Sequence, residues 1–169
     1  MTQKDHALHN ERACHLLAAN GAFPDWVVTT SFYAALHFVQ SRIFPFTEDG
    51  IEYTDINYYF RQNESKHGTK HLATVDLTYE RLDSLGSKYN WLYGQSRTAR
   101  YRKYKIPPED AKIAMEYLAD IKAHCYPNLV STQPSGAEVA GTKVHSDGIK
   151  PPEIVLPGQK VVKGSKPLN

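Results

Sequence analysis

The chain has 169 residues and a mass of 19.1 kDa, a length that favours a single folded domain. Its content of 41% hydrophobic and 11% aromatic residues supplies a core, which excludes a wholly disordered or fibrous chain. The formal charge of +2 is too small to indicate a nucleic-acid or membrane partner by itself. No apolar run reaches the roughly 18 residues of a membrane span, and the polar first residues lack the apolar stretch of a signal peptide, so we expect a cytoplasmic protein without a membrane partner.

The first third of the chain predicts two helices. Residues 5–20 are rich in Ala, Leu, Glu and His and end before Gly21, a residue suited to a helix C-terminus. Pro24 suits the first turn of a second helix. Residues 26–44 contain no Gly or Pro and are apolar on most of their surface, which predicts the buried central helix of a bundle.

The middle of the chain predicts two more helices after a stretch whose structure we leave open. That stretch, residues 45–64, is polar and rich in Tyr, with a turn predicted at Asp49-Gly50. Within residues 65–85, apolar side chains recur every three or four positions, which predicts a third helix. We place a fourth helix at residues 88–101.

A fifth helix is predicted between Pro107 and Cys125, because prolines and acids open it and apolar residues follow at steps of three and four. Short connections and the lack of strand alternation predict an all-α fold, an antiparallel up-and-down bundle of four to five helices over residues 1–126.

Residues 127–169 predict a disordered tail. Every aromatic residue lies at or before Tyr126, whereas six of the ten prolines and five of the ten glycines follow it. Such a composition does not bury enough surface to offset the entropy of ordering. An alternative is that residues 153–156 and 161–162 form strands or a docking peptide.

The densest chemical signal is the segment 97–105, which has five cations and two tyrosines but no acid. Arginine grips phosphate with two parallel donors and tyrosine offers a face for base stacking, so the segment predicts binding of RNA or a nucleotide. The candidate binding residues are Arg97, Arg100, Tyr101, Arg102, Lys103 and Tyr104. The alternative is that these cations only complement the dipole at a helix C-terminus.

A second signal is the pair Arg61 and His67, with His71 four residues further on. Histidine can act as an acid or base at a ribose hydroxyl while arginine stabilises charge on phosphate, so these three residues are candidates for RNA cleavage without a metal. The alternative is two polar helix residues, one of them facing the bundle. Gly68 stands where a zinc-binding HExxH motif has Glu, so we predict no metal and no cofactor.

Three other residues have simpler interpretations. Cys14 and Cys125 do not form a CxxC motif, and we predict that both are reduced, buried thiols. His37 lies within the apolar second helix and predicts a core histidine that is hydrogen-bonded to a neighbouring helix.

Two short motifs resemble those of HEPN domains: the stretch Ser31 to His37 (SFYAALH) in the second helix, and Arg97 to Tyr101 (RTARY) before a final helix that proline opens. The resemblance spans roughly residues 5–125 and also includes Lys70-His71. It implies a helical bundle, often a homodimer, in proteins concerned with RNA cleavage, toxin–antitoxin pairs, defence or nucleotide binding. Non-catalytic branches of the family pair with a nucleotidyltransferase, which is therefore an implied partner.

The resemblance leaves catalysis open. Many catalytic members have an Arg followed four to six residues later by His near the last long helix, but Lys103 stands six residues after Arg97 here. The rival interpretation is a non-catalytic module that dimerises or docks a partner, supported by a surplus of tyrosines, since Tyr is enriched at interfaces. Those tyrosines are Tyr53, Tyr58, Tyr59, Tyr89, Tyr93, Tyr101 and Tyr104.

Overall fold

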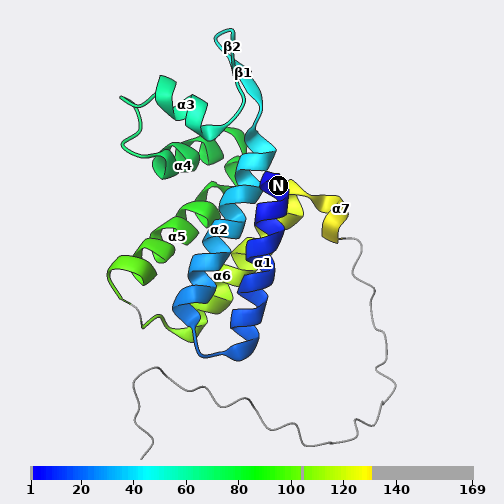
Figure 1. Cartoon of the computed structure of the whole chain (residues 1–169), viewed down its shortest axis with the longest axis vertical. Helices are drawn as coiled ribbons and strands as arrows, with labels where there is room; N and C mark the ends of the chain where they lie inside the picture. Colours follow the sequence, from blue (N-terminus) through cyan, green and yellow to red (C-terminus); the bar gives the residue numbers. More distant parts are fainter. Residues whose placement is uncertain (1, 104, 131–169) are drawn as a thin grey trace, which may run out of the picture. The chain divides into compact units, whose positions relative to one another are not determined.

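The computed structural model describes residues 2–103 and 105–130, and this part of the chain is mostly helical (Figure 1). Its elements are α1 (Gln3–Asn20), α2 (Pro24–Ile43), β1 (Phe46–Glu48), β2 (Ile51–Tyr53), α3 (Ile56–Gln62), α4 (Lys70–Arg81), α5 (Asp83–Tyr101), α6 (Pro108–Cys125) and α7 (Pro127–Val130). The predicted all-α class is confirmed for the described residues, with one short hairpin as the exception. The candidate strands at 153–156 and 161–162 lie outside the described residues, as does most of the predicted tail.

The first two predicted helices are confirmed as α1 and α2. At the start of α1 the Thr2 hydroxyl accepts a hydrogen bond from the Asp5 N–H, and the Asp5 carboxylate accepts one from the Thr2 N–H. This reciprocal pair satisfies donors that a helix start leaves free. Gly21 ends α1 at a φ of 73°, a left-handed conformation that glycine adopts without strain.

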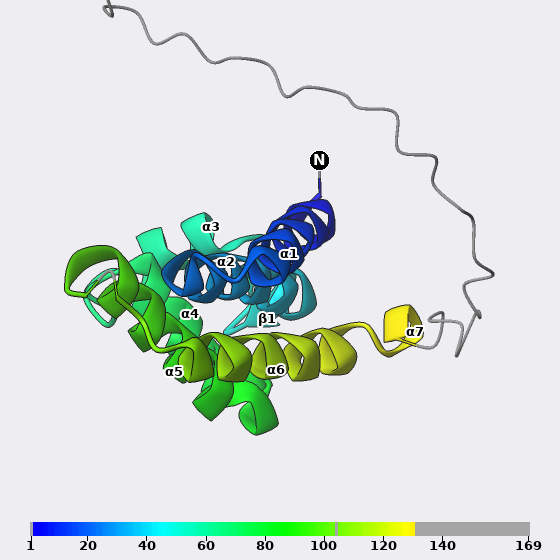
Figure 2. The ribbon, with the colours of Figure 1, turned by 90° about the horizontal axis from the view of Figure 1, so that it is seen from below.

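The predicted burial of α2 is also confirmed. Figures 1 and 2 show α2 between α1 on one side and α5 and α6 on the other, and it also contacts α4. Because neighbours surround it, apolar residues on almost every face of the helix are needed. The buried apolar residues of α2 are Val27, Val28, Phe32, Ala34, Ala35, Leu36, Phe38, Val39 and Ile43.

The stretch that the sequence left open forms a hairpin followed by α3. Strands β1 and β2 pair antiparallel around the predicted turn, where Asp49 and Gly50 have φ values of 49° and 76°. Positive φ at both central residues matches the twist of a tight hairpin. Asp55 then caps α3 by accepting hydrogen bonds from two backbone N–H groups. Arg81 of α4 lies 3.6 Å from the centre of the Phe46 ring and so fixes the hairpin to α4.

Both boundaries predicted for the third helix and the start predicted for the fourth were wrong, whereas the fourth helix ends at Tyr101 as predicted. Residues 65–69 precede α4, because the Thr69 hydroxyl caps its start by accepting a hydrogen bond from Leu72 N–H. The helical conformation is interrupted at Leu82, which ends α4 and precedes α5. Residues 83–87 therefore belong to α5. Gly86 lies within α5 and does not interrupt it. The Tyr79 ring packs in the space that a Cβ on residue 86 would need, which explains why glycine stands there.

The last predicted helix is confirmed as α6, which begins with Pro108 and buries one face against α2 and α5. Its buried residues are Ala111, Ala114, Leu118, Ile121 and Cys125, the set that the periodicity predicted. The folded part extends slightly beyond residue 126, because α7 covers the first four residues that were assigned to the tail.

Candidate functional site

Arg100 is the most firmly positioned cation of the predicted binding segment. It lies in the last turn of α5, where its Nη1 donates a hydrogen bond to the Tyr33 hydroxyl at 2.7 Å and its Nε donates to the Ser96 carbonyl at 3.1 Å. The guanidinium lies 5.3 Å from the centre of the Tyr33 ring and 5.1 Å from that of Tyr101. A half-buried arginine with this support loses little entropy when it binds an anion.

His71 lies in the first turn of α4, half-buried against aromatic rings. Its ring centre is 5.6 Å from that of Phe32 and 5.9 Å from that of Tyr93. Burial, together with the charges of Arg100 and Lys70, lowers the pKa of His71 below its ordinary value. Within the described residues neither ring nitrogen makes a hydrogen bond, so His71 is free to exchange a proton with a ligand.

His71 and three residues of the predicted binding segment line one pocket of about 330 Å³. The lining residues are Thr69, His71, Leu72, Tyr93, Arg97, Arg100 and Tyr101, and we name this the His71 pocket. Helix α4 contributes one wall and α5 the other. The pocket is therefore a product of the contact between α4 and α5, two helices that α2 also supports.

The pocket is electropositive. Arg97 is exposed and stacks 5.5 Å from the centre of the Tyr93 ring, and no acid is among the described lining residues. In the part of the chain that the structure describes, neither Arg97 nor Arg100 forms an ion pair. Two unneutralised guanidinium groups beside an exposed tyrosine suit a phosphate with an attached base.

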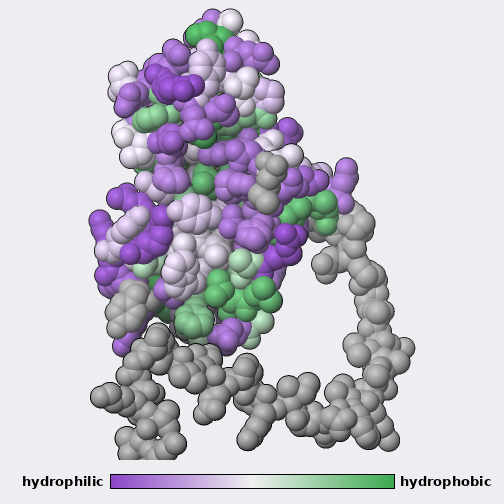
Figure 3. All heavy atoms as spheres, viewed as in Figure 1, coloured by the Kyte–Doolittle hydropathy of each residue, from purple (hydrophilic) through white to green (hydrophobic). Residues whose placement is uncertain are grey.

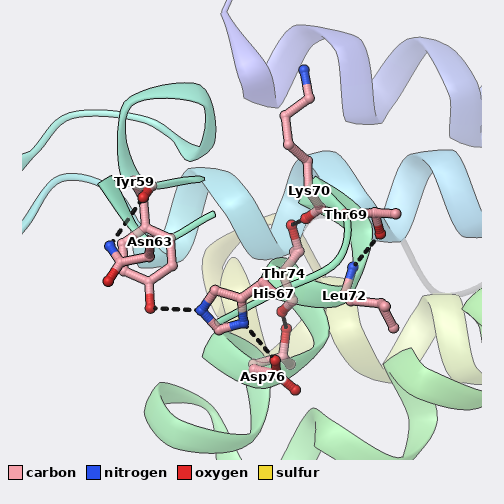
Figure 4. A network of polar contacts seen from close by, with 9 residues as sticks. Tyr59, Asn63, His67, Thr69, Lys70, Leu72, Thr74 and Asp76 are labelled. Atoms are coloured by element: carbon pink, nitrogen blue, oxygen red, sulfur yellow. Dashed lines mark hydrogen bonds and ion pairs between the residues drawn. The ribbon is translucent and has the colours of Figure 1, made fainter. Parts of the chain in front are cut away.

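His67, the other histidine of the predicted catalytic set, lies in a different environment (Figure 4). Its side chain is buried, its Nδ1 donates to the Asp76 carboxylate at 2.7 Å, and its Nε2 is hydrogen-bonded to the Tyr59 hydroxyl at 3.3 Å. Both ring nitrogens are thus occupied by the protein. Arg61 is exposed at the end of α3, and within the described residues no hydrogen bond or ion pair joins it to either histidine.

The remaining residues of the binding segment lie beyond the helix. Helix α5 ends at Tyr101, and the exposed Arg102 and Lys103 follow it. Tyr104 lies outside the described residues, so its role in binding stays a prediction. Arg97, Arg100 and Tyr101 line a common pocket.

Most of the surplus tyrosines belong to the interior. Four of them are buried: Tyr53, Tyr59, Tyr89 and Tyr93. Of the others, Tyr58 is half-buried and Tyr101 is 75% exposed. The tyrosine content is therefore explained by the core and gives little support to an interface.

The simpler predictions are confirmed for the two cysteines, whereas His37 has the predicted hydrogen bond to a neighbouring helix but is half-buried rather than in the core. His37 is half-buried and its Nδ1 is hydrogen-bonded to the Gln3 side chain of α1. Cys14 and Cys125 are buried free thiols, and burial raises the pKa of each. These groups form no part of the His71 pocket.

Sequence reasoning missed the residues that hold this pocket in place, chiefly Tyr33, Tyr93 and Ser96. Tyr93 stands four positions before Arg97 on α5, a spacing that places the two side chains together. That signal was present in the sequence. The contact between Tyr33 and Arg100 joins residues 67 positions apart, which periodicity within one helix does not reveal.

Three general observations accompany this geometry. No helix in the described part of the chain is long and apolar enough to cross a membrane. Residues 2–103 and 105–130 contain no group of three or more His, Cys, Asp or Glu side chains arranged to hold a metal ion. Comparison with protein-family models, with curated proteins and with solved structures finds no match to this chain.

Proposed function

We propose that the protein is a HEPN-like antiparallel helical bundle that binds RNA through the His71 pocket. The observation that supports this most is the convergence of His71, Arg97, Arg100 and Tyr101 on one electropositive pocket. Arginines contact phosphate with two donors, and the exposed Tyr101 ring offers a stacking face for a base.

The two motifs that resemble HEPN domains also contact one another. Arg100 belongs to the second motif and donates a hydrogen bond to Tyr33 of the first. Through this contact both motifs help to position the Arg100 guanidinium at the pocket. The contact supports the family resemblance, and from that resemblance we also propose a role in toxin–antitoxin or defence systems and a nucleotidyltransferase as a protein partner.

The same pocket suits metal-independent cleavage of RNA. A lowered pKa leaves the His71 ring unprotonated near neutral pH, so it can take the proton of a ribose 2'-hydroxyl. The 2'-oxygen then attacks the adjacent phosphorus, the bond to the 5'-oxygen breaks, and water protonates the leaving oxygen. Arg97 and Arg100 stabilise the charge that develops on the phosphate. The products are a 2',3'-cyclic phosphate and a 5'-hydroxyl.

This function is tested by incubating the full chain with a mixed RNA pool in excess EDTA, reading both retention on a filter and fragmentation on a gel. The wild type is compared with Arg97→Ala/Arg100→Ala and with His71→Gln. Two exposed arginines outside the pocket provide a matched control, Arg12→Ala/Arg61→Ala, and His37→Gln controls for loss of a half-buried histidine.

We expect the wild type and both controls to retain and cleave RNA, His71→Gln to retain it intact, and the pocket arginine variant to do neither. Equal retention by the pocket variant and the arginine control would refute RNA binding at this site. Retention of RNA by the wild type, both controls and His71→Gln, with no fragments in any sample, would leave a binding protein and remove the cleavage step.

A second candidate function is dimerisation, and one observation favours it. Leu16, Phe23 and Trp26 are 74%, 47% and 54% exposed around the turn between α1 and α2. Contact with a second copy would remove these apolar side chains from water. Sedimentation should then show a wild-type dimer and a Trp26→Ser monomer, whereas a monomeric wild type at high concentration would exclude this function.

A further inference from the structure

Helix α5 carries a second pocket beside the first. It has a volume of about 480 Å³ and is lined by Trp91, Gly94, Gln95, Arg97, Thr98, Tyr101 and Arg102. We name it the Trp91 pocket. Arg97 and Tyr101 line this pocket and the His71 pocket alike, so the two are neighbours.

Helix geometry explains why the pockets lie side by side. Trp91 and Thr98 lie seven apart on one face of α5, and Arg102, which directly follows the helix, lines the same pocket. Tyr93 and Arg100 lie seven apart on the adjacent face. Arg97 and Tyr101 stand between these two faces and form a ridge that separates the pockets.

The Trp91 pocket has the chemistry of a nucleotide subsite. The Trp91 ring is half-buried and held by an edge contact to Tyr117, whose ring centre is 5.2 Å away, so it is a fixed flat surface. Arg97 and Arg102 supply two cations, and the described lining residues include no carboxylate. The surface over α5 is predominantly hydrophilic in Figure 3. Aromatic faces beside arginines are the combination that binds single-stranded nucleic acid.

Gly94 keeps this pocket open. It is exposed within α5, and a Cβ built on it would meet no atom within 4 Å. No close packing therefore requires a glycine here, although glycine within a helix is less stable than alanine by roughly 0.5–1 kcal/mol. Any longer side chain would project into the space between Trp91 and Arg97.

We propose that the Trp91 pocket binds the nucleotide next to the one in the His71 pocket, so that the protein selects single-stranded RNA over duplex RNA. This inference rests on the proposed function of the His71 pocket. The backbone would cross the ridge, where Arg97 reaches the phosphate between the two nucleotides. Bases must be unpaired to stack on Trp91 and Tyr101, and a duplex does not present them.

The test is the affinity of the full chain for fluorescein-labelled 2'-O-methyl dodecaadenylate, measured by anisotropy. This strand lacks the attacking 2'-hydroxyl and so stays intact. The variants are Trp91→Ala and Gly94→Leu for the subsite and Arg100→Ala for the His71 pocket. Gly94→Ala is the matched control, since its single added carbon lies in open space. Gly94→Leu tests the pocket even if Trp91→Ala loosens the contact with Tyr117.

We expect Gly94→Leu and Trp91→Ala to weaken binding about tenfold or more, the range of one lost stacked base, and Gly94→Ala to bind as the wild type does. The same strand annealed to its complement should bind more weakly than the single strand. Wild-type affinity in both subsite variants, with weakened binding in Arg100→Ala, would overturn the subsite alone. Equal affinity for single strand and duplex would also overturn it, and no binding by the wild type would remove the proposed function with it.

Discussion

Two histidines four residues apart in the sequence have opposite surroundings in the structure. His67 is buried, and the protein occupies both of its ring nitrogens through Asp76 and Tyr59. His71 is half-buried at a pocket, and its ring nitrogens have no hydrogen bond within the described residues. Spacing alone made both candidates for catalysis, whereas their hydrogen bonds distinguish a structural histidine from one available to a ligand.

The same contrast applies to the arginines. Arg61 has the sequence spacing to His67 that the catalytic interpretation needs, but it is exposed at the end of α3. Arg97 and Arg100 come from a helix later in the chain and line the pocket with His71. Proximity in the fold therefore pairs His71 with cations that are 26 and 29 positions away.

The largest expected effect separates the two histidines by activity. We expect His71→Gln to lower the rate of metal-independent RNA cleavage by about 10²- to 10⁴-fold, because a general base is lost. His67→Gln should cleave at nearly the wild-type rate wherever it remains folded. The measurement is initial cleavage rate in excess EDTA, and a larger loss in the His67 variant would reverse the assignment.

The next largest effect is a difference in stability between variants of His67 and His71. His67→Leu should lower the free energy of unfolding by about 1–3 kcal/mol, because the buried Tyr59 hydroxyl loses its partner. His71→Leu should change it much less, since no hydrogen bond within the described residues is removed. Urea titration followed by circular dichroism provides both values, and equal losses would show that the two sites do not differ.

A smaller effect concerns the arginines. Arg97→Ala should weaken RNA binding and reduce the slope of log affinity against log salt by about 1, because one phosphate contact is lost. Arg61→Ala should leave that slope at its wild-type value. Filter binding across a salt series measures the slope, and identical slopes for both variants would place the phosphate contacts elsewhere.

The smallest effect is a pH dependence of stability. Because burial lowers the pKa of both His37 and His71, the unfolded chain binds protons more readily than the folded chain below their ordinary value of 6.5. The free energy of unfolding should therefore fall as pH drops below about 6.5 and stay level from there to about pH 8, below the range in which the two buried thiols titrate. His37→Gln/His71→Gln should flatten this fall, and an unchanged fall in urea titrations at several pH values would contradict the lowered pKa values.

How much the sequence predicted depends on the range of the interactions involved. A long apolar run without Gly or Pro identified α2, and apolar residues three and four apart identified the buried face of α6. Periodicity misplaced the boundary between α4 and α5, where a break at Leu82 and the packing of Tyr79 over Gly86 decide the outcome. Hairpin β1–β2 was missed beyond its turn because its strands have only three residues each.

The candidate site was predicted in pieces and not as a whole. The cationic segment and His71 were both identified from residue type, but the sequence grouped His71 with Arg61 and His67. Only the packing of α4 against α5 brings His71 to Arg100, and only the packing of α2 brings Tyr33 to Arg100 and Phe32 to His71. A local sequence pattern does not reveal contacts between helices that are far apart in the sequence.

The central claim is that RNA binds at His71 and leaves His67 untouched. Its most direct test follows the imidazole NMR resonances of both histidines, assigned with His71→Gln and His67→Gln, while 2'-O-methyl dodecaadenylate is added to the full chain. We predict a saturable shift of the His71 resonances at RNA concentrations that leave those of His67 in place. Saturable RNA binding with unmoved His71 resonances, or with larger shifts at His67, would contradict the account.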